Sequence, residues 1–286
     1  MDHLLFRPLT PEDLPWLIRC RDAAAHPFTA LSPVSLISWA DCYGFTIAGE
    51  EDFFVIHSRY DKGYYAPVGN PEKGRAFMEE AARRDPSVRF LYLTEQEAGA
   101  FAERGWDVFW RAETSEYILS TARTALEDGA RASQNFRRRC HQFVRKYGSY
   151  TVSPVTGDMI GRLRDISGSF LAAHGGELSD QAVVETELSH FDALGISGIL
   201  LTFPDGRQAF MLGYENTPDC FTLTMVRYDS TLPEETTAIC MHELAARLLG
   251  QYPYLNVEED LGMEGLRKAK MLLLPVDLLK TYEVRP

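Results

Sequence analysis

The chain has 286 residues, 45% of them hydrophobic, and a formal net charge of −12. Its length exceeds that of a usual single domain and its apolar content excludes a disordered chain, so we expect two packed domains. The acidic balance argues against a general nucleic-acid coat, and the apolar runs are far shorter than the ~20 residues of a membrane span.

The N-terminus shows no secretory pattern, so we expect a cytoplasmic protein. Five cysteines show no CxxC pair or regular spacing, which favours reduced thiols over a disulfide framework or a zinc site. The histidines are scattered without ligand spacing, and we predict no metal.

The first part of the chain alternates strands with helices. A helix begins after Thr10, which is placed to act as N-cap before Pro11. We predict strands at 53–57, 64–67, 90–93 and 106–110, and helices at 75–84 and 95–104. This alternation favours an α/β domain over residues 1–120.

Residues 121–148 are predicted to form a connector and a basic linker helix. Phe136, Cys140, Phe143 and Tyr147 recur at helical spacing and form an apolar stripe. The segment also carries six bases and no acid between 131 and 146: Arg131, Arg137, Arg138, Arg139, Arg145 and Lys146. An anionic partner is expected there, such as the acceptor stem of a tRNA; the alternative is a solvated surface.

The remaining residues, 149–286, are predicted to repeat the pattern. Helices are expected at 158–173, 181–194 and 233–249, the last with Thr231 as N-cap, and strands at 198–203, 208–215, 221–227 and 252–257. Both parts place helices first and a mixed sheet afterwards. This repetition indicates a duplicated fold.

The segment from Asn256 to Lys270 concentrates acids, two glycines and three bases, and Pro275 follows it. Its sequence matches the pattern N-x-E-E-D-x-G-x-x-G-L-R-x-A-K-x-x-x-x-P at every fixed position. This signature resembles that of the DUF2156 family, which is related to the C-terminal domain of phosphatidylglycerol lysyltransferases. The resemblance implies tandem GNAT-like (acetyltransferase-like) domains, of α/β (α+β) class with mixed central sheets. It also implies similarity to aminoacyl-tRNA-dependent transferases acting on lipids or peptidoglycan precursors.

Two departures from this family stand out. The linker helix is one residue longer than usual and lacks the family's asparagines, although its basic character is kept. The lipid aminoacyltransferases carry an acid three residues before an arginine on a central strand. Here Arg227 is in place, whereas the position of the acid is Thr224. A reaction that needs this carboxylate is therefore in question.

The candidate catalytic residues are Arg227 and the acids Glu258, Glu259 and Asp260. Arg227 ends a strand and would bind the donor or an oxyanion; the alternative is a salt bridge to Asp229 or Glu234. One of the three clustered acids would act as general base.

The alternative for these acids is structural: they would cap the helix at 264–270 and pair with its bases. Arg267 and Lys270 lie three residues apart and would bind an anion together or pair with the acids. Arg131, Arg137 and Arg138 would hold an anionic group of the substrate.

The donor is expected to be aminoacyl-tRNA or acyl-CoA, and the acceptor a lipid headgroup or a small amine. Residues 234–237 replace the glycine-rich loop that binds the pyrophosphate of coenzyme A, which disfavours that donor in the C-terminal domain. We therefore expect acyl or aminoacyl transfer. The rivals are an acyl-CoA-dependent N-acyltransferase and a non-catalytic ligand-binding module.

Overall fold

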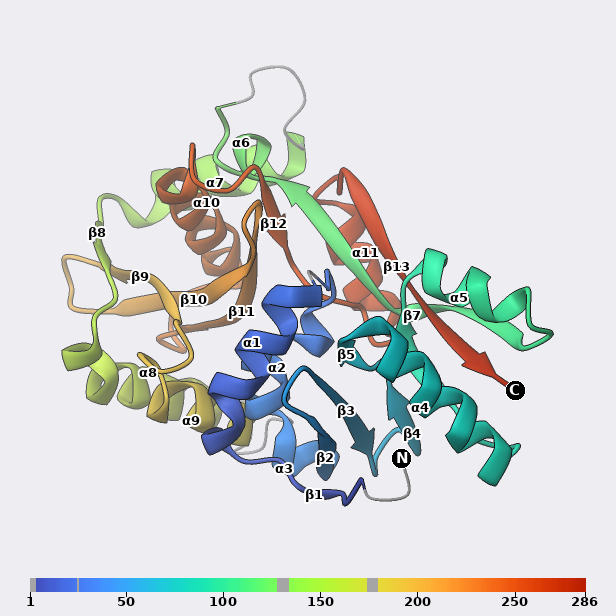
Figure 1. Cartoon of the computed structure of the whole chain (residues 1–286). Coiled ribbons are helices and arrows are strands. Elements are labelled where there is room, and N and C mark those ends of the chain that lie inside the picture. The colour runs from blue at the N-terminus through green and yellow to red at the C-terminus, as the bar shows by residue number, and fades with distance from the viewer. Residues whose placement is uncertain (1–3, 25, 128–133, 174–179) are drawn as a thin grey trace. The chain divides into compact units, whose positions relative to one another are not determined.

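The computed structural model describes residues 4–24, 26–127, 134–173 and 180–286. The chain divides into two compact units (Figure 1). Unit 1 comprises Met1–Glu116 and Leu279–Pro286, and unit 2 comprises Tyr117–Leu278. The predicted three-part division at residues 120 and 148 concerns successive segments of the chain and stays a prediction.

Unit 1 is a mixed sheet covered by helices. Its strands follow the order β1-β2-β3-β4-β6-β13, with β5 beside β3. They are β1 (Arg7–Pro8), β2 (Phe45–Glu50), β3 (Phe53–Ser58), β4 (Gly63–Tyr65), β5 (Val68–Gly69), β6 (Phe90–Leu93), the first part of β7 (Asp107–Ser120) and most of β13 (Asp277–Arg285). The helices are α1 (Leu14–Ala24), α2 (Pro33–Ser38), α3 (Ala40–Tyr43), α4 (Pro71–Arg84) and α5 (Glu95–Ala102), with short 3-10 turns η1 (Pro11–Asp13) and η2 (Thr29–Leu31).

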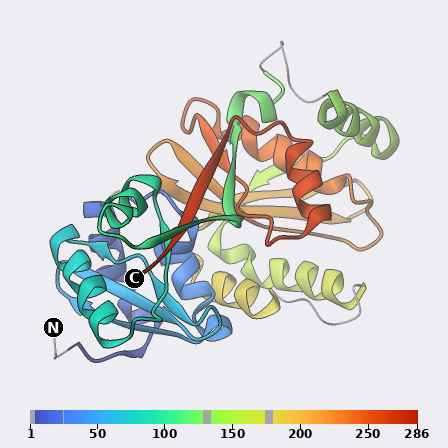
Figure 2. The ribbon, with the colours of Figure 1, turned by 90° about the vertical axis from the view of Figure 1, so that its right-hand side faces the viewer.

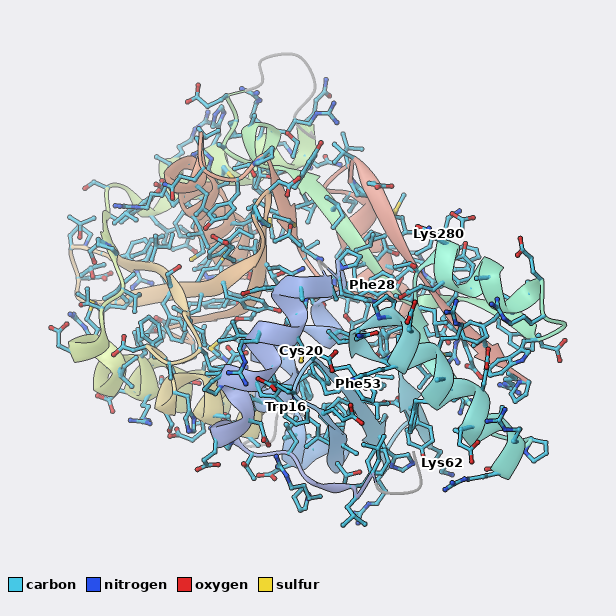
Figure 3. All side chains as sticks on the ribbon, viewed as in Figure 1. Trp16, Cys20, Phe28, Phe53, Lys62 and Lys280 are labelled. Carbon is cyan, nitrogen blue, oxygen red and sulfur yellow. The ribbon has the colours of Figure 1, made fainter. Side chains whose placement is uncertain are left out.

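Apolar side chains from α1, from the segment before η2 and from β3 form the core of unit 1. Cys20, Phe28 and Phe53 are almost fully buried (Figure 3). Trp16 reaches the neighbouring strand, where its indole N–H donates to the carbonyl of Glu50 at 2.8 Å. Burial of large aromatic side chains is the main source of stability in such a core.

Unit 2 is also a mixed sheet, with strand order β7-β12-β11-β10-β9-β8. Its strands are β8 (Thr151–Pro154), β9 (Ser197–Thr202), β10 (Gln208–Thr217), β11 (Cys220–Tyr228), β12 (Tyr254–Asn256) and the end of β7. Its helices are α6 (Thr121–Thr124), α7 (Gln134–Tyr147), α8 (Ile160–Ala173), α9 (Gln181–Ser189), α10 (Thr236–Leu248) and α11 (Glu264–Met271), with the 3-10 turn η3 (Gly157–Met159) before α8.

Helices cover both faces of the sheet in unit 2. Phe136, Cys140 and Phe143 of α7 join the residues of α10 in one apolar cluster, which confirms the predicted stripe. Helices α8 and α9 lie on the opposite face of β9 to β11 (Figure 2). Tyr228 of β11 belongs to the apolar cluster on the α10 face, so its neighbour Arg227 points to the α8–α9 face.

The parallel pair β11 and β12 separates soon after it forms. Only Cys220–Thr222 of β11 pairs with Tyr254–Asn256 of β12, whereas β11 itself continues to Tyr228. A bulge lies in the same region, because Gly213 pairs with Leu223 and Leu212 with Met225, so that Thr224 has no opposite residue. Bulges redirect side chains and are common beside functional sites. The sheet therefore opens beyond Thr222.

Some predicted boundaries were wrong. Helix α10 begins at Thr236 with Glu235 as its N-cap, not at residue 233 with Thr231 as N-cap, because Thr231 donates its N–H and hydroxyl to Asp229 instead. Strand β7 runs ten residues beyond the predicted 106–110 segment, to Ser120. Helix α4 begins at Pro71, where Asn70 caps it, and α9 ends at Ser189.

Candidate functional site

Arg227 is held on β11 by partners that the sequence did not indicate. The residue is 7% exposed, its Nη2 donates to Asp180 Oδ2 at 2.7 Å, and its Nη1 donates to the carbonyl of Val226 at 2.9 Å. The guanidinium also lies 5.1 Å from the centroid of the Phe170 ring. The predicted alternative partner Asp229 instead binds Thr231. Arg227 is therefore paired with Asp180, the N-cap residue of α9, and not with the predicted Asp229.

Thr224 contacts a carboxylate from the same helix. Its hydroxyl donates to Glu187 Oε2 at 3.1 Å, and Glu187 is only 3% exposed. Asp180 and Glu187 are seven residues apart, which is close to two helical turns, so both side chains leave the same face of α9. Helix α9 therefore brings a carboxylate to the position where the sequence of β11 has a threonine in place of an acid.

Several buried polar atoms on this face lack a hydrogen-bond partner among the described residues. They are Nε of Arg227 and Oγ1 of Thr222 on β11, Oγ of Ser167 on α8, and Oε1 of Gln181 on α9. An unsatisfied buried polar group costs about 1–3 kcal/mol, so natural proteins seldom leave one without a purpose. A polar ligand on this face would satisfy them. We call Asp180, Glu187, Thr224 and Arg227 the α9–β11 site.

The predicted acid Asp260 lies elsewhere in unit 2, at the centre of a buried polar cluster. Its Oδ2 accepts from Tyr117 Oη at 2.6 Å and from Arg267 Nε at 2.7 Å, and its Oδ1 accepts from Gly262 N at 2.9 Å. Burial raises the pKa of Asp260, but the hydrogen bonds from Arg267 and Tyr117 lower that pKa by more. Both oxygens are engaged, which favours the structural interpretation of this acid.

Lys270 completes this cluster through the backbone. Its Nζ donates to the carbonyl of Val257 at 2.5 Å and also to the carbonyl of Glu259. The loop turns sharply, since Glu258 has φ of +60°, and the Asn256 side chain accepts from Glu258 N at 2.7 Å. Arg267 and Lys270 thus both bind the loop between β12 and α11. The segment from Asn256 to Lys270 is therefore held in place by these bonds. We call the bonds of Asp260 with Tyr117 and Arg267, together with those of Lys270, the buried clasp.

Glu258 and Glu259 follow shortly after β12. They lie on the β12 side of the opening between β11 and β12. Both are partly exposed, unlike Asp260. The chain here is anchored to β7, because Tyr117 N donates to the carbonyl of Glu258 at 3.2 Å. Glu258 and Glu259 are thus the partly exposed members of the predicted acid trio.

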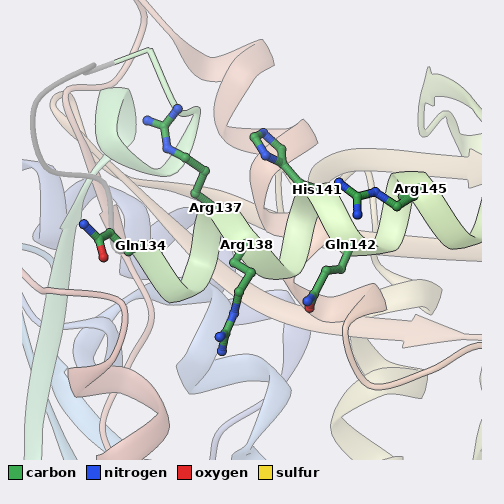
Figure 4. Close-up of a pocket in the computed structure, with 6 residues that line it drawn as sticks. All are labelled: Gln134, Arg137, Arg138, His141, Gln142 and Arg145. Atoms are coloured by element: carbon green, nitrogen blue, oxygen red, sulfur yellow. The ribbon is translucent and has the colours of Figure 1, made fainter.

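The basic residues of α7 form a separate surface. Arg137, Arg138 and Arg145 line an open depression together with Gln134, His141 and Gln142 (Figure 4). Arg131 lies outside the described residues. Because α7 packs on the α10 face of the sheet, this surface does not share a face with Arg227. That Arg137 and Arg138 hold an anionic group of the substrate stays a prediction.

A line of contacts nevertheless leads from α7 to the end of β11. Tyr147 closes α7, and both Lys146 and Arg207 place their charges over its ring, at 5.1 and 5.7 Å from the centroid. Arg207 Nη1 then lies 3.5 Å from the carbonyl of Thr231, in the turn that follows β11. These contacts connect the end of α7 with the turn that follows β11.

Comparison with known proteins identifies the family. Residues 29–285 match the family described as phosphatidylglycerol lysyltransferase, C-terminal. The chain belongs to this family. The predicted resemblance is confirmed, and no curated protein matches this sequence.

Solved structures confirm the predicted α/β class with mixed sheets for this lysyltransferase-family chain. A conserved protein of unknown function from Bacteroides thetaiotaomicron is 24% identical, with 99% of each chain covered and a TM-score of 0.82. The C-terminal domain of a putative lysylphosphatidylglycerol synthetase from Agrobacterium fabrum is 15% identical (96% and 92% covered, TM-score 0.67). L-PGS from Bacillus licheniformis is 14% identical (97% and 92% covered, TM-score 0.65).

FemX, another solved structure, is 8% identical, with 98% and 96% of the chains covered and a TM-score of 0.63. This similarity concerns the fold alone. Within the described residues of this family member, every helix is too short or too polar to cross a bilayer.

The N-termini of α10 and α4 in this family member have N–H groups that are already bonded within the described residues. At α10 the N–H groups of Thr236 and Thr237 donate to the carbonyls of Pro233 and Glu234, at 2.9 and 3.1 Å. Glu235 is the N-cap and brings negative charge where a pyrophosphate would bind. In unit 1 the N–H groups that open α4 are occupied by the Asn70 side chain.

Proposed function

We propose that the chain transfers an amino acid from aminoacyl-tRNA to a lipid headgroup or a small-molecule acceptor, with the aminoacyl group bound at the α9–β11 site. The observation that carries the proposal is the pairing of β11 with α9. Asp180 binds the guanidinium of Arg227, and the carboxylate of Glu187, which is 3% exposed, accepts from the hydroxyl of Thr224. A buried carboxylate can accept a hydrogen bond from a cationic group, and the ammonium of an aminoacyl ester is such a group.

Each member of the site has a distinct part in this proposal. Glu187 accepts a hydrogen bond from the ammonium of the amino acid, while Thr224 fixes the orientation of that carboxylate. Asp180 holds the guanidinium of Arg227 in place. The unpartnered Nε–H of Arg227 then donates to the ester carbonyl, where negative charge develops as the tetrahedral intermediate forms.

The general base is assigned to the β12 edge of the opening between β11 and β12, opposite the β11 edge that carries Arg227. Acyl transfer requires that the acceptor lose a proton as it attacks. Glu258 and Glu259 follow β12 and are partly exposed, whereas Asp260 is buried. The predicted base is therefore proposed to be Glu258 or Glu259, with Asp260 supporting the loop.

The tRNA itself is proposed to lie along α7. Lys and Arg side chains on one helix face bind phosphates without sequence preference. Arg138 and Arg145 are exposed on such a face, and the contacts of Tyr147 with Arg207 lead from it to the turn after β11. The aminoacylated 3′ end of the tRNA would then pass this turn and reach the α9–β11 site.

The second candidate, acyl-CoA-dependent N-acyltransfer, is favoured by one observation, the separation of β11 from β12 that can hold a pantetheine arm. Its phosphates would need the N-terminus of α10. That N-terminus carries Glu234 and Glu235, and its first N–H groups are already bonded within the turn. Electrostatic repulsion between these acids and a pyrophosphate makes acyl-CoA the weaker candidate.

Native mass spectrometry of the full chain tests the proposal. The protein is mixed with aminoacyl-tRNA, with the same tRNA uncharged, with N-acetylated aminoacyl-tRNA and with acetyl-CoA. We expect the protein to bind aminoacyl-tRNA at least tenfold more tightly than uncharged tRNA or N-acetylated aminoacyl-tRNA, because only the free ammonium can pair with Glu187. Glu187→Gln and Arg227→Ala should remove this preference.

Helices α8 and α9 supply matched controls. Arg164 and Glu185 form an exposed ion pair, with Arg164 Nη2 2.7 Å from Glu185 Oε1. Arg164→Ala and Glu185→Gln should bind charged tRNA as the wild type does. Equal binding of charged and N-acetylated tRNA by the wild type would contradict the ammonium site. Retention of acetyl-CoA alone would move the chain to the second candidate.

A further inference from the structure

Three buried polar groups around the α9–β11 site have no part in the transfer proposed above. They are the hydroxyls of Ser167 on α8 and Thr222 on β11 and the side-chain oxygen of Gln181 on α9, and each lacks a hydrogen-bond partner among the described residues. Ser167 is 2% exposed and Thr222 is 0% exposed. Hydroxyls without partners at this depth indicate that a hydrogen-bonding ligand reaches them.

The packing of α8 against α9 places Ser167 beside the site. In the first half of α8, Arg164 Nη2 lies 2.7 Å from Glu185 Oε1 of α9. One turn after Ser167, the ring of Phe170 lies 5.1 Å from the guanidinium of Arg227, which is bound at the start of α9. The two helices therefore run antiparallel. Ser167 lies midway between these contacts, on the buried face of α8 that packs on α9 and β11.

Thr222 and Gln181 approach the site from the other two elements. Thr222 lies on β11 where the sheet begins to open, and its neighbours Phe221 and Leu223 belong to the apolar cluster on the α10 face. Because side chains alternate along a strand, Thr222 points to the α8–α9 face. Gln181 follows Asp180, whose carboxylate binds Arg227. Polar groups from three elements thus converge on one face, as in a ligand-binding site.

The groups that are left over are all uncharged. Asp180 already binds Arg227, and Glu187 is the proposed partner of the ammonium of the amino acid. A cationic side chain on that amino acid would therefore find both carboxylates of the α9–β11 site occupied and would meet only hydroxyls and an amide. An apolar side chain would leave the same hydroxyls unpaired. A neutral side chain with hydrogen-bonding groups meets neither obstacle.

We propose that Ser167, Thr222 and Gln181 form the subsite for the side chain of the transferred amino acid, and that this side chain is uncharged and hydrogen-bonding, as in serine or asparagine. The inference rests on the proposed function, because it takes the aminoacyl group to be bound at the α9–β11 site. The family is described by lysyl transfer, so such a subsite would set this chain apart within it. A site built from hydrogen-bonding groups strongly rejects a substrate that leaves them unpaired.

Binding of one tRNA that carries different amino acids tests this proposal. Native mass spectrometry of the full chain compares the seryl, asparaginyl, leucyl and lysyl esters of the same tRNA with the uncharged tRNA. We expect the wild type to bind the seryl or the asparaginyl ester at least tenfold more tightly than the leucyl and lysyl esters. Ser167→Ala and Thr222→Val should lower this preference at least fivefold. Ser189→Ala, which removes an exposed hydroxyl on α9, should leave it unchanged.

Urea unfolding followed by circular dichroism separates this role from a structural one. A buried hydroxyl without a partner does not stabilise the free protein, so Ser167→Ala and Thr222→Val should not lower the midpoint of unfolding. A lower midpoint in both variants would mean that the hydroxyls are bonded in the folded chain, and it would overturn the proposal.

Three results of the binding experiment would also overturn the subsite: tightest binding of the lysyl or leucyl ester, equal binding of all four esters, or an unchanged preference in both variants. Equal binding of the four esters, each more tightly than uncharged tRNA, would overturn the subsite alone and leave the proposed function in place. If no ester binds more tightly than uncharged tRNA, the proposed function itself fails.

Discussion

Replacing Asp260 with asparagine removes the charge at the centre of the buried clasp while keeping the size of the side chain. The carboxylate accepts from Tyr117 Oη, from Gly262 N and from Nε and Nη2 of Arg267. An amide offers only one acceptor oxygen, and its NH₂ group must face donors. Asp260→Asn should therefore leave buried groups unpaired and destabilise unit 2.

The size of this effect follows from the burial of the pair. Removing one partner of a buried ion pair costs about 3–5 kcal/mol. Arg267 is 45% exposed and can be rehydrated, so we expect the lower end, about 3 kcal/mol, against a typical total of about 5–15 kcal/mol. Glu264→Gln is the matched control, because Glu264 forms an exposed pair with Lys268 that is worth about 0.5 kcal/mol or less.

The assay is urea unfolding followed by circular dichroism, since all four tryptophans precede residue 117 and report on unit 1. The pKa of Asp260 is lowered in the folded state, so its stabilisation is present above the unfolded pKa and is lost as pH falls through the folded one. The difference between wild type and variant should shrink below about pH 4. An unchanged urea midpoint with loss of transfer would refute this reasoning and make Asp260 catalytic.

Three further outcomes are expected. Glu283 is buried in unit 1, and its pKa falls from 4.5 to about 2 because the hydrogen bonds from Arg89 and Arg285 outweigh the effect of burial. This lowering of the pKa corresponds to about 3 kcal/mol of stability at 1.36 kcal/mol per pKa unit. Urea unfolding monitored by tryptophan fluorescence should therefore show that Glu283→Gln is less stable than the wild type above pH 4.5. The difference should disappear as the pH falls toward 2. Thr224→Val removes the hydroxyl that orients Glu187 and should cost about 1 kcal/mol of stability and lower kcat/KM; unchanged kinetics would contradict its role. Arg227→Lys keeps the charge but loses Nε, and should lower kcat about 100-fold with tRNA binding retained; a milder loss would mean that charge alone suffices.

Local patterns in the sequence predicted much of the fold. Strand β6 (Phe90–Leu93) lies at its predicted position, and the apolar spacing around Phe143 predicted α7. These features depend on neighbours in the chain, which sequence periodicity reports directly. The family signature was equally local, because Asn256 to Pro275 forms one continuous loop and helix.

Long-range pairing was beyond the sequence. Strand β13 was not predicted, since Lys280 and Glu283 interrupt its apolar pattern, and it pairs with β6, nearly two hundred residues earlier. The carboxylate of Glu283 is buried there only because arginines from distant strands surround it. No property of the C-terminal segment alone indicates those arginines.

The α9–β11 site shows the same limit. Sequence proximity suggested Asp229 or Glu234 as the partner of Arg227, but the acid that pairs with it lies 47 positions away, at Asp180. Glu187 was missed because an acid in a helix is usually a surface residue. Its spacing of seven from Asp180 was visible in the sequence, but the strand that it faces was not.

The most direct test of the central claim is transfer itself. The full chain is incubated with tRNA that carries a radiolabelled amino acid and with phosphatidylglycerol vesicles, and the label in the extracted lipid is counted. Our account predicts labelled lipid with the wild type and with Glu185→Gln, and a loss of about 100-fold with Glu187→Gln. Equal labelling by Glu185→Gln and Glu187→Gln would contradict the assignment of the site, and absence of any labelled lipid or small-molecule product would contradict aminoacyl transfer.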